Sequence, residues 1–367
     1  MNNLDNKDFA ILLALEANPL STIQELSIKL GIARQTIKKR IKKLRERKII
    51  IKSISFIKPE ALGLVRVFIV ATSPNWEKLM VLERILDDYP YIRYRSRIFG
   101  STYGEFIIFE IPAGKHNHLR TFFQQLKEVG VVTQYILKKS IGNRTFSPSN
   151  LLKYDFKRNF WDFSWDKWFE KFSEINPQDE LPTPKINYNL NELKPTHLEI
   201  IRELTANADI KQSVLMKKLN LSRAEMSRQY NFVKKSFISN VRLLYKRELF
   251  DLTETCLIFA EDVNADVLKA FFVHTARDKP PFQHSLELLE DNGLVFWAQM
   301  TANHTASFSF NIWKKIPTVN FYIMASKDPR GSKIFHFHPA NFDFKKHSWR
   351  TSKAYMIFDP LKSINST

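Results

Sequence analysis

The chain repeats itself at one constant offset, which places Leu193 over Leu4. The segments Leu4–Ile49 and Leu193–Ile238 align without a gap, and ten of the 46 aligned pairs are identical. The same offset later pairs Gly104 with Gly293. Most identical positions are apolar and have helical spacing. Two unrelated helices could converge on such a pattern, which is the alternative to a duplication. The unbroken offset favours a tandem duplication, which requires the chain to fold as two related halves.

The start of each half predicts three helices followed by a strand. In the first half we expect helices over Leu4–Glu16, Ile23–Leu30 and Ala33–Lys48, and a strand over Ile49–Phe56. Ser21 or Thr22 caps the second helix, and Gly31 ends it in a tight turn. A short turn between the second and third helices, with strands after them, is typical of a winged helix-turn-helix.

The rest of each half has the order βαββαβ. In the first half the strands are expected at Val65–Ala71, Ile92–Phe99, Phe106–Ile111 and Val131–Leu137, with two intervening helices. This order predicts a ferredoxin-like domain, an antiparallel sheet with both helices on one face. The fold class is therefore α+β. The predicted domains are a winged helix-turn-helix (1–56), a ferredoxin-like domain (60–141), a connector (142–190), a second winged helix-turn-helix (191–247), a second ferredoxin-like domain (250–327) and a C-terminal extension (328–367).

The connector is too long for a plain loop and is rich in aromatic residues. Trp161, Trp165, Trp168 and Phe172 have the spacing of one helix face. We expect a helix that braces a neighbouring domain; a partner-binding helix is the alternative. The prolines that follow predict an extended linker, and they are Pro177, Pro182 and Pro184.

Positive charge is concentrated near the amino end. The net charge is +18, and nine of the twenty residues in Gly31–Ile50 are Lys or Arg. Such an excess indicates a polyanionic partner, nucleic acid or an anionic membrane, although a basic but inert surface is possible. The apolar face of the helix Ala33–Lys48 belongs to a domain core, so it is not free to insert into a membrane. Double-stranded DNA is therefore the expected partner.

The helix Ala33–Lys48 is the predicted recognition helix. Its N-terminal part enters the major groove in a helix-turn-helix, which places Arg34, Gln35 and Lys38 near base edges. Later basic residues would contact phosphates. The predicted DNA-binding residues are Arg34, Gln35, Thr36, Lys38, Lys39, Lys42, Lys43 and Arg45, and in the second, less basic copy Ser222, Arg223, Ser227 and Arg228.

The first sixty residues resemble the N-terminal domain of the Lrp/AsnC family. The matching residues include Leu4-Asp5, Glu25-Leu26, Gly31-Ile32, Arg40-Ile41 and Leu62-Gly63. The resemblance implies a transcription regulator of bacterial or archaeal type, whose ferredoxin-like domains pair into dimers and bind small effectors. The effector hairpin would be Gly100, Ser101, Thr102, Tyr103 and Gly104, although the Asp that usually follows the family's glycine is missing from "FGSTYGEF".

Two copies in one chain suggest either a homodimer or an intrachain pseudo-dimer formed through the ferredoxin-like domains. The two recognition helices differ in sequence, so intrachain pairing predicts an asymmetric operator. A DNA binder that coats any sequence, like a chromatin protein, is a further alternative.

An enzyme is the remaining alternative, because siroheme decarboxylases are similar in combining these two domains. Arg93, Arg95 and Arg97 alternate on one strand and could hold tetrapyrrole carboxylates, but we interpret them as an exposed basic face. His284 aligns with Arg95. We predict no enzyme and no cofactor.

No metal site is predicted either. The pairs His116/His118 and His336/His338 have no Cys or carboxylate cluster to complete a metal shell, so we interpret them as surface histidines. Cys256 is the single cysteine, and no leader or membrane-length apolar run is present. We therefore expect a cytoplasmic protein.

Overall fold

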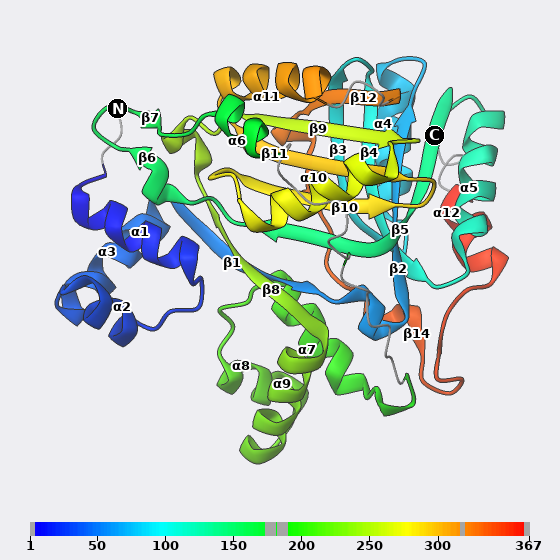
Figure 1. The fold of residues 1–367 in the computed structure, drawn as a ribbon. Helices are drawn as coiled ribbons and strands as arrows, with labels where there is room; N and C mark the ends of the chain where they lie inside the picture. The colour runs from blue at the N-terminus through cyan, green and yellow to red at the C-terminus, as the bar shows by residue number, and fades with distance from the viewer. Residues whose placement is uncertain (1–3, 173–180, 182–189, 316–319, 363–367) are drawn as a thin grey trace.

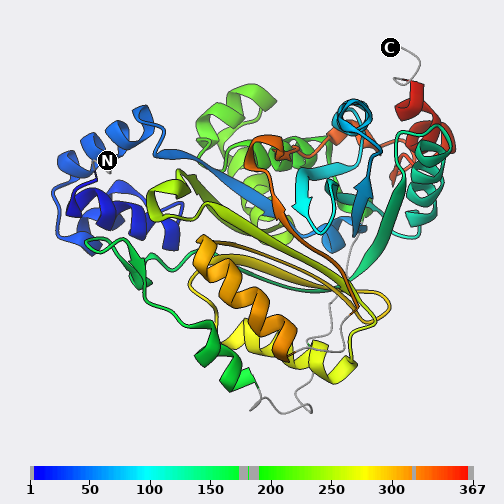
Figure 2. The ribbon, with the colours of Figure 1, turned by 90° about the horizontal axis from the view of Figure 1, so that it is seen from above.

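The computed structural model describes residues 4–172, 181, 190–315 and 320–362. A central sheet carries helices on its outer faces. Two three-helix units lie outside it, one at the left and the other at the bottom of Figure 1. In Figure 2, α10 (Ala265–Arg277) and α11 (Ala302–Lys315) lie on one side of the sheet and α5 (His116–Glu128) on another. No helix in the described residues is long and apolar enough to cross a bilayer.

Two three-helix units are built alike. The first contains α1 (Asn6–Ala17), α2 (Ile23–Leu30) and α3 (Arg34–Glu46), and the second contains α7 (Pro195–Ala206), α8 (Gln212–Leu219) and α9 (Arg223–Phe237). Each helix of the second unit begins at the residue that the internal repeat aligns with the start of its counterpart. Thr22 and Glu25 form a capping box on α2, and Gly31 then takes a left-handed conformation with φ 64°. Asn220 does the same after α8 with φ 51°.

The strands that follow the helical units pair with each other. β1 (Ile50–Ile57) and β8 (Ile238–Tyr245) form a two-stranded antiparallel ribbon between the units. The sequence predicted each strand as part of its own unit, whereas the structure pairs it with the strand of the other. A strand needs a partner for its backbone N–H and C=O groups, and here the other half supplies it.

The central sheet joins both halves of the chain. Its strands are β2 (Leu64–Thr72), β3 (Ile92–Gly100), β4 (Gly104–Pro112), β5 (Gln134–Ser147), β9 (Glu254–Glu261), β10 (Gln283–Leu289), β11 (Gly293–Met300), β12 (Asn320–Lys327) and β13 (Lys333–Ile334). The order is β12-β9-β11-β10-β5-β2-β4-β3-β13, and β12 also pairs with β3. The longer strands, β2 to β5 and β9 to β12, therefore close into a barrel that both ferredoxin-like units share.

β5 is one of two strands that connect the units. Its first part pairs with β2 and its last part, from Ser140 onward, pairs with β10. Phe68, Phe106, Leu257 and Phe259, from strands of both halves, pack together in one cluster. The opposite faces of the strands pack against α4 (Trp76–Asp87) and α5 (His116–Glu128) in one half, and against α10 (Ala265–Arg277) and α11 (Ala302–Lys315) in the other.

Two glycines occupy equivalent places on β4 and β11. A Cβ at Gly104 would clash with the carbonyl oxygen of Ala71, and one at Gly293 would crowd that of Ala260. The internal repeat aligns the two alanines as it aligns the two glycines. The repeated glycine is therefore needed for the same close approach of two strands in both halves.

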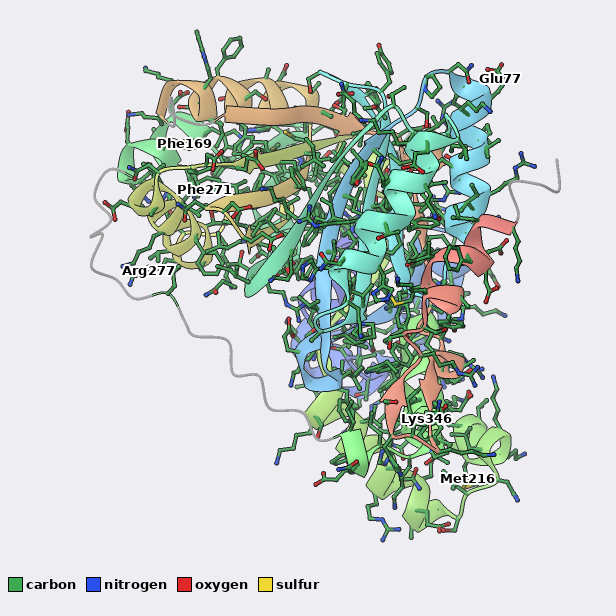
Figure 3. All side chains as sticks on the ribbon, turned by 90° about the vertical axis from the view of Figure 1, so that its right-hand side faces the viewer. Glu77, Phe169, Met216, Phe271, Arg277 and Lys346 are labelled. Carbon is green, nitrogen blue, oxygen red and sulfur yellow. The ribbon has the colours of Figure 1, made fainter. Side chains whose placement is uncertain are left out.

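Each half ends in an arm that packs on the other half. The first arm contains β6 (Tyr154–Asp155), β7 (Phe160–Trp161) and α6 (Trp165–Phe172); the second contains β14 (Phe342–Asp343), β15 (Ser348–Trp349), a π-helical turn (Ala354–Phe358) and α12 (Asp359–Leu361). In Figure 3 the second arm, marked by Lys346, extends from the α4 side towards the second helical unit, marked by Met216.

The two arms are attached by equivalent hydrogen bonds from a tryptophan indole. Trp161 Nε1 donates to the carbonyl oxygen of Phe250 at 2.9 Å, and Trp349 Nε1 donates to that of Leu62 at 2.8 Å. The prediction of one helix face is wrong for Trp161, because the helix begins at Trp165 and Trp161 lies in β7. The predicted linker prolines lie outside the described residues.

Candidate nucleic-acid interface and neighbouring pocket

The recognition helix α3 divides into an apolar and a basic face. Ile37, Ile41 and Leu44 are buried in the first helical unit. Thr36 is half-buried. The remaining predicted DNA-binding residues of α3 are exposed, and these are Arg34, Gln35, Lys38, Lys39, Lys42, Lys43 and Arg45. The buried stripe holds the helix on its unit and turns the cations outward.

Only some cations of α3 have acidic partners. Arg40 bonds to Asp5 at 2.6 Å and to Asp8 at 2.8 Å, so it fastens α3 to α1. Lys42 lies 3.7 Å from Glu46. Among the described residues, no acidic partner accompanies four other cations, which are Arg34, Lys38, Lys39 and Lys43. The first turn of α3 also has no acidic residue, so the helix dipole adds to this positive field.

Arg45 was predicted to contact DNA, but its side chain forms an ion pair within the protein. Its Nη2 lies 3.0 Å from Asp209 Oδ2, in the segment between α7 and α8. The pair links the first helical unit to the second. Because the Arg45 side chain is 54% exposed, the ion pair stabilises the fold only weakly.

The helix α9, predicted to be the second recognition helix, has an acidic residue in its first turn. Ser222 Oγ accepts from Glu225 N at 3.3 Å and donates to the Glu225 carboxylate at 2.7 Å, which makes Ser222 a helix cap. This hydroxyl lowers the pKa of Glu225, so the carboxylate stays charged. Arg223, Ser227 and Arg228 are exposed. α9 therefore attracts phosphate less strongly than α3.

The predicted effector hairpin is the exposed turn between β3 and β4. Tyr103 is 75% exposed, and Ser101 and Gly100 are also exposed. A role in effector binding for Gly100–Gly104 stays a prediction.

The interpretation of Arg93, Arg95 and Arg97 as an exposed basic face is wrong. Arg95 is buried and bonds to Asp87 at 2.6 Å, with Glu83 at 3.1 Å. Arg97 bonds to Glu83 as well, at 2.6 Å. These carboxylates come from α4, so two of the arginines attach that helix to the sheet. His284 is buried too, with Nδ1 2.8 Å from the carbonyl oxygen of Phe282.

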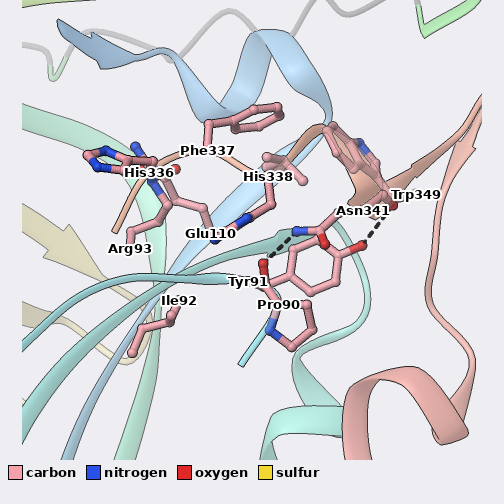
Figure 4. A pocket seen from close by; sticks show the side chains of 11 residues that line it. Pro90, Tyr91, Ile92, Arg93, Glu110, His336, Phe337, His338, Asn341 and Trp349 are labelled. Atoms are coloured by element: carbon pink, nitrogen blue, oxygen red, sulfur yellow. Dashed lines mark hydrogen bonds and ion pairs between the residues drawn. The ribbon is translucent and has the colours of Figure 1, made fainter. Parts of the chain in front are cut away.

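A small pocket of about 10 Å³, room for about one water molecule and partly open to solvent, lies where the second arm covers β3 and β4 (Figure 4). Its lining residues are Leu64, Pro90, Tyr91, Ile92, Arg93, Glu110, His336, Phe337, His338, Asn341 and Trp349. They come from segments far apart in the sequence, so no local sequence motif marks the pocket. The alternation in "KIFHFH" is a usable signal: Phe335 and Phe337 are buried, and both histidines are exposed.

The charges beside the pocket are largely paired. Glu110 lies 2.9 Å from Arg93 and 3.3 Å from Arg66, and Arg66 also lies 2.9 Å from Glu287 on β10. Partial burial of the imidazole rings lowers the pKa of both His336 and His338, and the neighbouring Arg93 lowers both pKa values further. The imidazoles are therefore mainly neutral near pH 7 and able both to donate and to accept a hydrogen bond.

Comparisons with known proteins identify one domain. Residues 4–51 match the family model described as winged helix-turn-helix DNA-binding. The match covers the first three-helix unit and the start of β1. No curated protein matches the chain.

Solved structures extend the likeness to the whole chain. A siroheme decarboxylase, NirDL, is similar with a TM-score of 0.56 and 12% identity, over 98% of this chain and 99% of that one. Its complex with an iron-uroporphyrin III analogue gives 0.55 and 12% over 91% and 95%. An AsnC family transcriptional regulator from Agrobacterium tumefaciens gives 0.33 and 17%, over 38% of this chain and 90% of that one. At such identities the decarboxylase match establishes a shared fold.

Proposed function

We propose that the protein is a sequence-preferring double-stranded DNA-binding transcription regulator of Lrp/AsnC type. The observation that carries this proposal is the face of α3, where Arg34, Lys38, Lys39 and Lys43 are exposed without acidic partners among the described residues. Clustered cations repel one another, and a phosphate backbone relieves that repulsion while it releases its counterions. The matched DNA-binding domain supports the same proposal.

We assign different tasks to the two ends of α3. Arg34, Gln35 and Lys38 lie in the first turns, where a recognition helix meets base edges. Lys39, Lys42 and Lys43 lie further along and would contact phosphates, which adds affinity without sequence information.

We infer a tandem duplication whose halves pair within one chain. The three helices of each unit begin at aligned positions of the repeat, and the two arms make matching indole hydrogen bonds. The shared barrel and the β1–β8 ribbon take the place of a dimer interface between two chains. One chain therefore presents two different helix-turn-helix units to DNA.

The test is DNA affinity by fluorescence anisotropy at several salt concentrations, after selection of a preferred site from genomic fragments. Arg34→Ala should weaken the selected site by about 1–3 kcal/mol and change mixed DNA little. Lys43→Ala should weaken both equally and reduce the salt slope by about one. Lys127→Ala removes an exposed cation of α5 and is the matched control.

Two results would contradict the proposal. If Arg34→Ala and Lys43→Ala bind both DNAs as the parent does, α3 is not the interface. If the parent binds selected and mixed DNA equally tightly, the protein coats DNA without sequence preference.

A second candidate function is tetrapyrrole decarboxylation, which the fold of siroheme decarboxylase NirDL favours. The sequence offers Arg93, Arg95 and Arg97 for tetrapyrrole carboxylates. All three are paired with carboxylates of the protein, Arg93 with Glu110 and the other two with Glu83 of α4. The Soret band of iron-uroporphyrin tests this candidate: a shift on adding one equivalent of protein would favour the enzyme, and an unchanged band the regulator.

A further inference from the structure

The barrel closes between the two halves of the chain at two seams, and the second seam is short. At the first seam β5 pairs with β10, and β5 itself continues from the sheet of the first half, so the halves are covalently joined there. At the second seam, within the described residues, β12 pairs with β3 through three residue pairs, which are Ala325 with Gly100, Ser326 with Phe99 and Lys327 with Ile98. A short ladder has few backbone hydrogen bonds, so the β12–β3 seam is the joint at which the barrel can open.

This seam ends at a buried lysine that lies among aromatic rings. Lys327 is 7% exposed. Its Nζ lies 4.7 Å from the ring centroid of Phe106, 4.9 Å from that of Tyr94 and 5.0 Å from that of Trp297. Tyr94 and Phe106 belong to the first half of the chain and Trp297 to the second. These three rings, the aromatic cage, therefore surround the amine only while the seam is closed.

The charged groups near Lys327 do not neutralise it. The titratable side chains of the neighbouring elements are Tyr94 of β3, Arg242 of β8, Glu254 and Cys256 of β9, and Asp328, the next residue. Glu254 accepts a hydrogen bond from Ser326 at 3.3 Å, and Asp328 lies 3.9 Å from Arg97. Among the residues that the structure describes, no carboxylate forms an ion pair with Lys327. An ammonium group in the cage would therefore be buried without a counter-charge.

Arg242 makes the charged form of Lys327 less favourable still. Its guanidinium lies 5.2 Å from the centroid of the Trp297 ring, which Lys327 also faces. Burial lowers the pKa of Lys327 from 10.5 to about 7, and repulsion by Arg242 contributes to the decrease. In water the amine would recover its ordinary pKa. The closed seam thus favours a neutral amine, and an open, hydrated seam favours a charged one.

We propose that the β12–β3 seam is a proton-controlled joint, which opens when Lys327 gains a proton and closes when Lys327 loses it. The neutral amine fits the aromatic cage, whereas the ammonium group is hydrated only after β12 leaves β3. Opening therefore takes up one proton. Closure is strongest above pH 10.5, weakens as the pH falls towards 7, and changes little below that.

An open seam would loosen the two halves of the molecule. β5 and the β1–β8 ribbon would still join them, but β12 would no longer be held against β3. The second half carries α9, so the orientation of α9 relative to α3 would become less fixed. An effect on DNA binding rests on the proposed function, whereas the opening of the seam does not depend on it.

The experiment is hydrogen–deuterium exchange of the full chain at pH 6, 7, 8 and 9, read by mass spectrometry and corrected for the intrinsic exchange rate at each pH. In the parent, opening measured on peptides with residues 98–100 and 325–327 should decrease roughly fiftyfold from pH 7 to pH 9, but only about twofold from pH 6 to pH 7. Lys327→Met should open rarely and to the same extent at every pH. Lys127→Met removes an exposed cation of α5 and should behave as the parent does.

Peptides from the β5–β10 seam distinguish local opening from unfolding of the whole protein, and their exchange should not follow this pH dependence. The proposal is overturned if the β12–β3 peptides of the parent open equally at every pH, if Lys327→Met keeps the parental dependence, or if the β5–β10 peptides follow the same curve. A parent that shows the pH-dependent seam but binds no DNA would refute the regulator and leave the joint intact.

Discussion

Two cations, Lys327 and Arg242, are buried in the protein, and neither forms an ion pair within the described residues, although Glu16 lies near Arg242. Lys327 Nζ lies 4.7–5.0 Å from the ring centroids of Tyr94, Phe106 and Trp297. Arg242 lies over Trp297 as well, at 5.2 Å. Ring faces compensate only part of the lost hydration of a buried cation. Burial lowers the pKa of Lys327 to about 7 and that of Arg242 to about 9.

Lys327→Met should therefore stabilise the protein. With a folded pKa of about 7 against 10.5 for an ordinary lysine, the unfolded chain holds more protons between these pH values, so parental stability rises with pH across that window. Below pH 7 the whole penalty applies. Urea unfolding should show Lys327→Met more stable than the parent by roughly 1–4 kcal/mol at pH 7, and by less at pH 10.

The exposed Lys127→Met is the control and should change stability little at either pH. Equal effects of Lys327→Met at pH 7 and pH 10 would show that Lys327 is charged and solvated in the folded protein.

At the scale of elements, individual helices and strands could be predicted from the sequence. Which strands pair with each other could not. The helix α3 follows from the spacing of Ile37, Ile41 and Leu44. The pairing of β5 with β10 does not, because the edge of a strand bonds through backbone groups that every residue has. The arm repeat is detectable in the sequence: "DFKRNFW" at Asp155 recurs as "DFKKHSW" at Asp343, close to the offset that relates the helical units. The pocket is lined by β3, β4 and residues of 336–349, which come together only in the folded chain, so it could not be predicted from motifs.

The ion pair between α3 and the second helical unit leads to a prediction about the salt dependence of DNA affinity. Asp209 holds Arg45, and burial raises the pKa of this Asp while Arg45 opposes the rise. Asp209→Asn should free Arg45 for a phosphate and steepen the plot of log affinity against log salt by about 0.9. Anisotropy titrations at four salt concentrations measure this slope.

Asp162→Asn removes an exposed charge from the first arm and controls for net charge. If both variants change the slope alike, Arg45 gains no new contact and only the overall charge matters.

At the scale of the molecule, the two halves are coupled at three places. The barrel closes through β5–β10 and β12–β3, the β1–β8 ribbon joins the helical units, and each arm is anchored on the opposite half. Separate rotation of the halves would break all three. The positions of α3 and α9 relative to each other are therefore set within one chain. Under the proposed function, this would set the spacing of the two DNA segments.

An operator for such a chain should be asymmetric. Hydroxyl-radical footprinting on the selected DNA should show two unlike half-sites, separated by one or more helical turns of about 34–36 Å. Arg34→Ala should remove protection from one half-site and Arg223→Ala from the other, because α3 and α9 have different exposed residues. The half-site of α3 should be protected at higher salt, since α9 carries Glu225 in its first turn. Lys127→Ala should leave both footprints unchanged. A perfect palindrome that loses both halves with either variant would mean that two chains, each using one unit, bind the DNA.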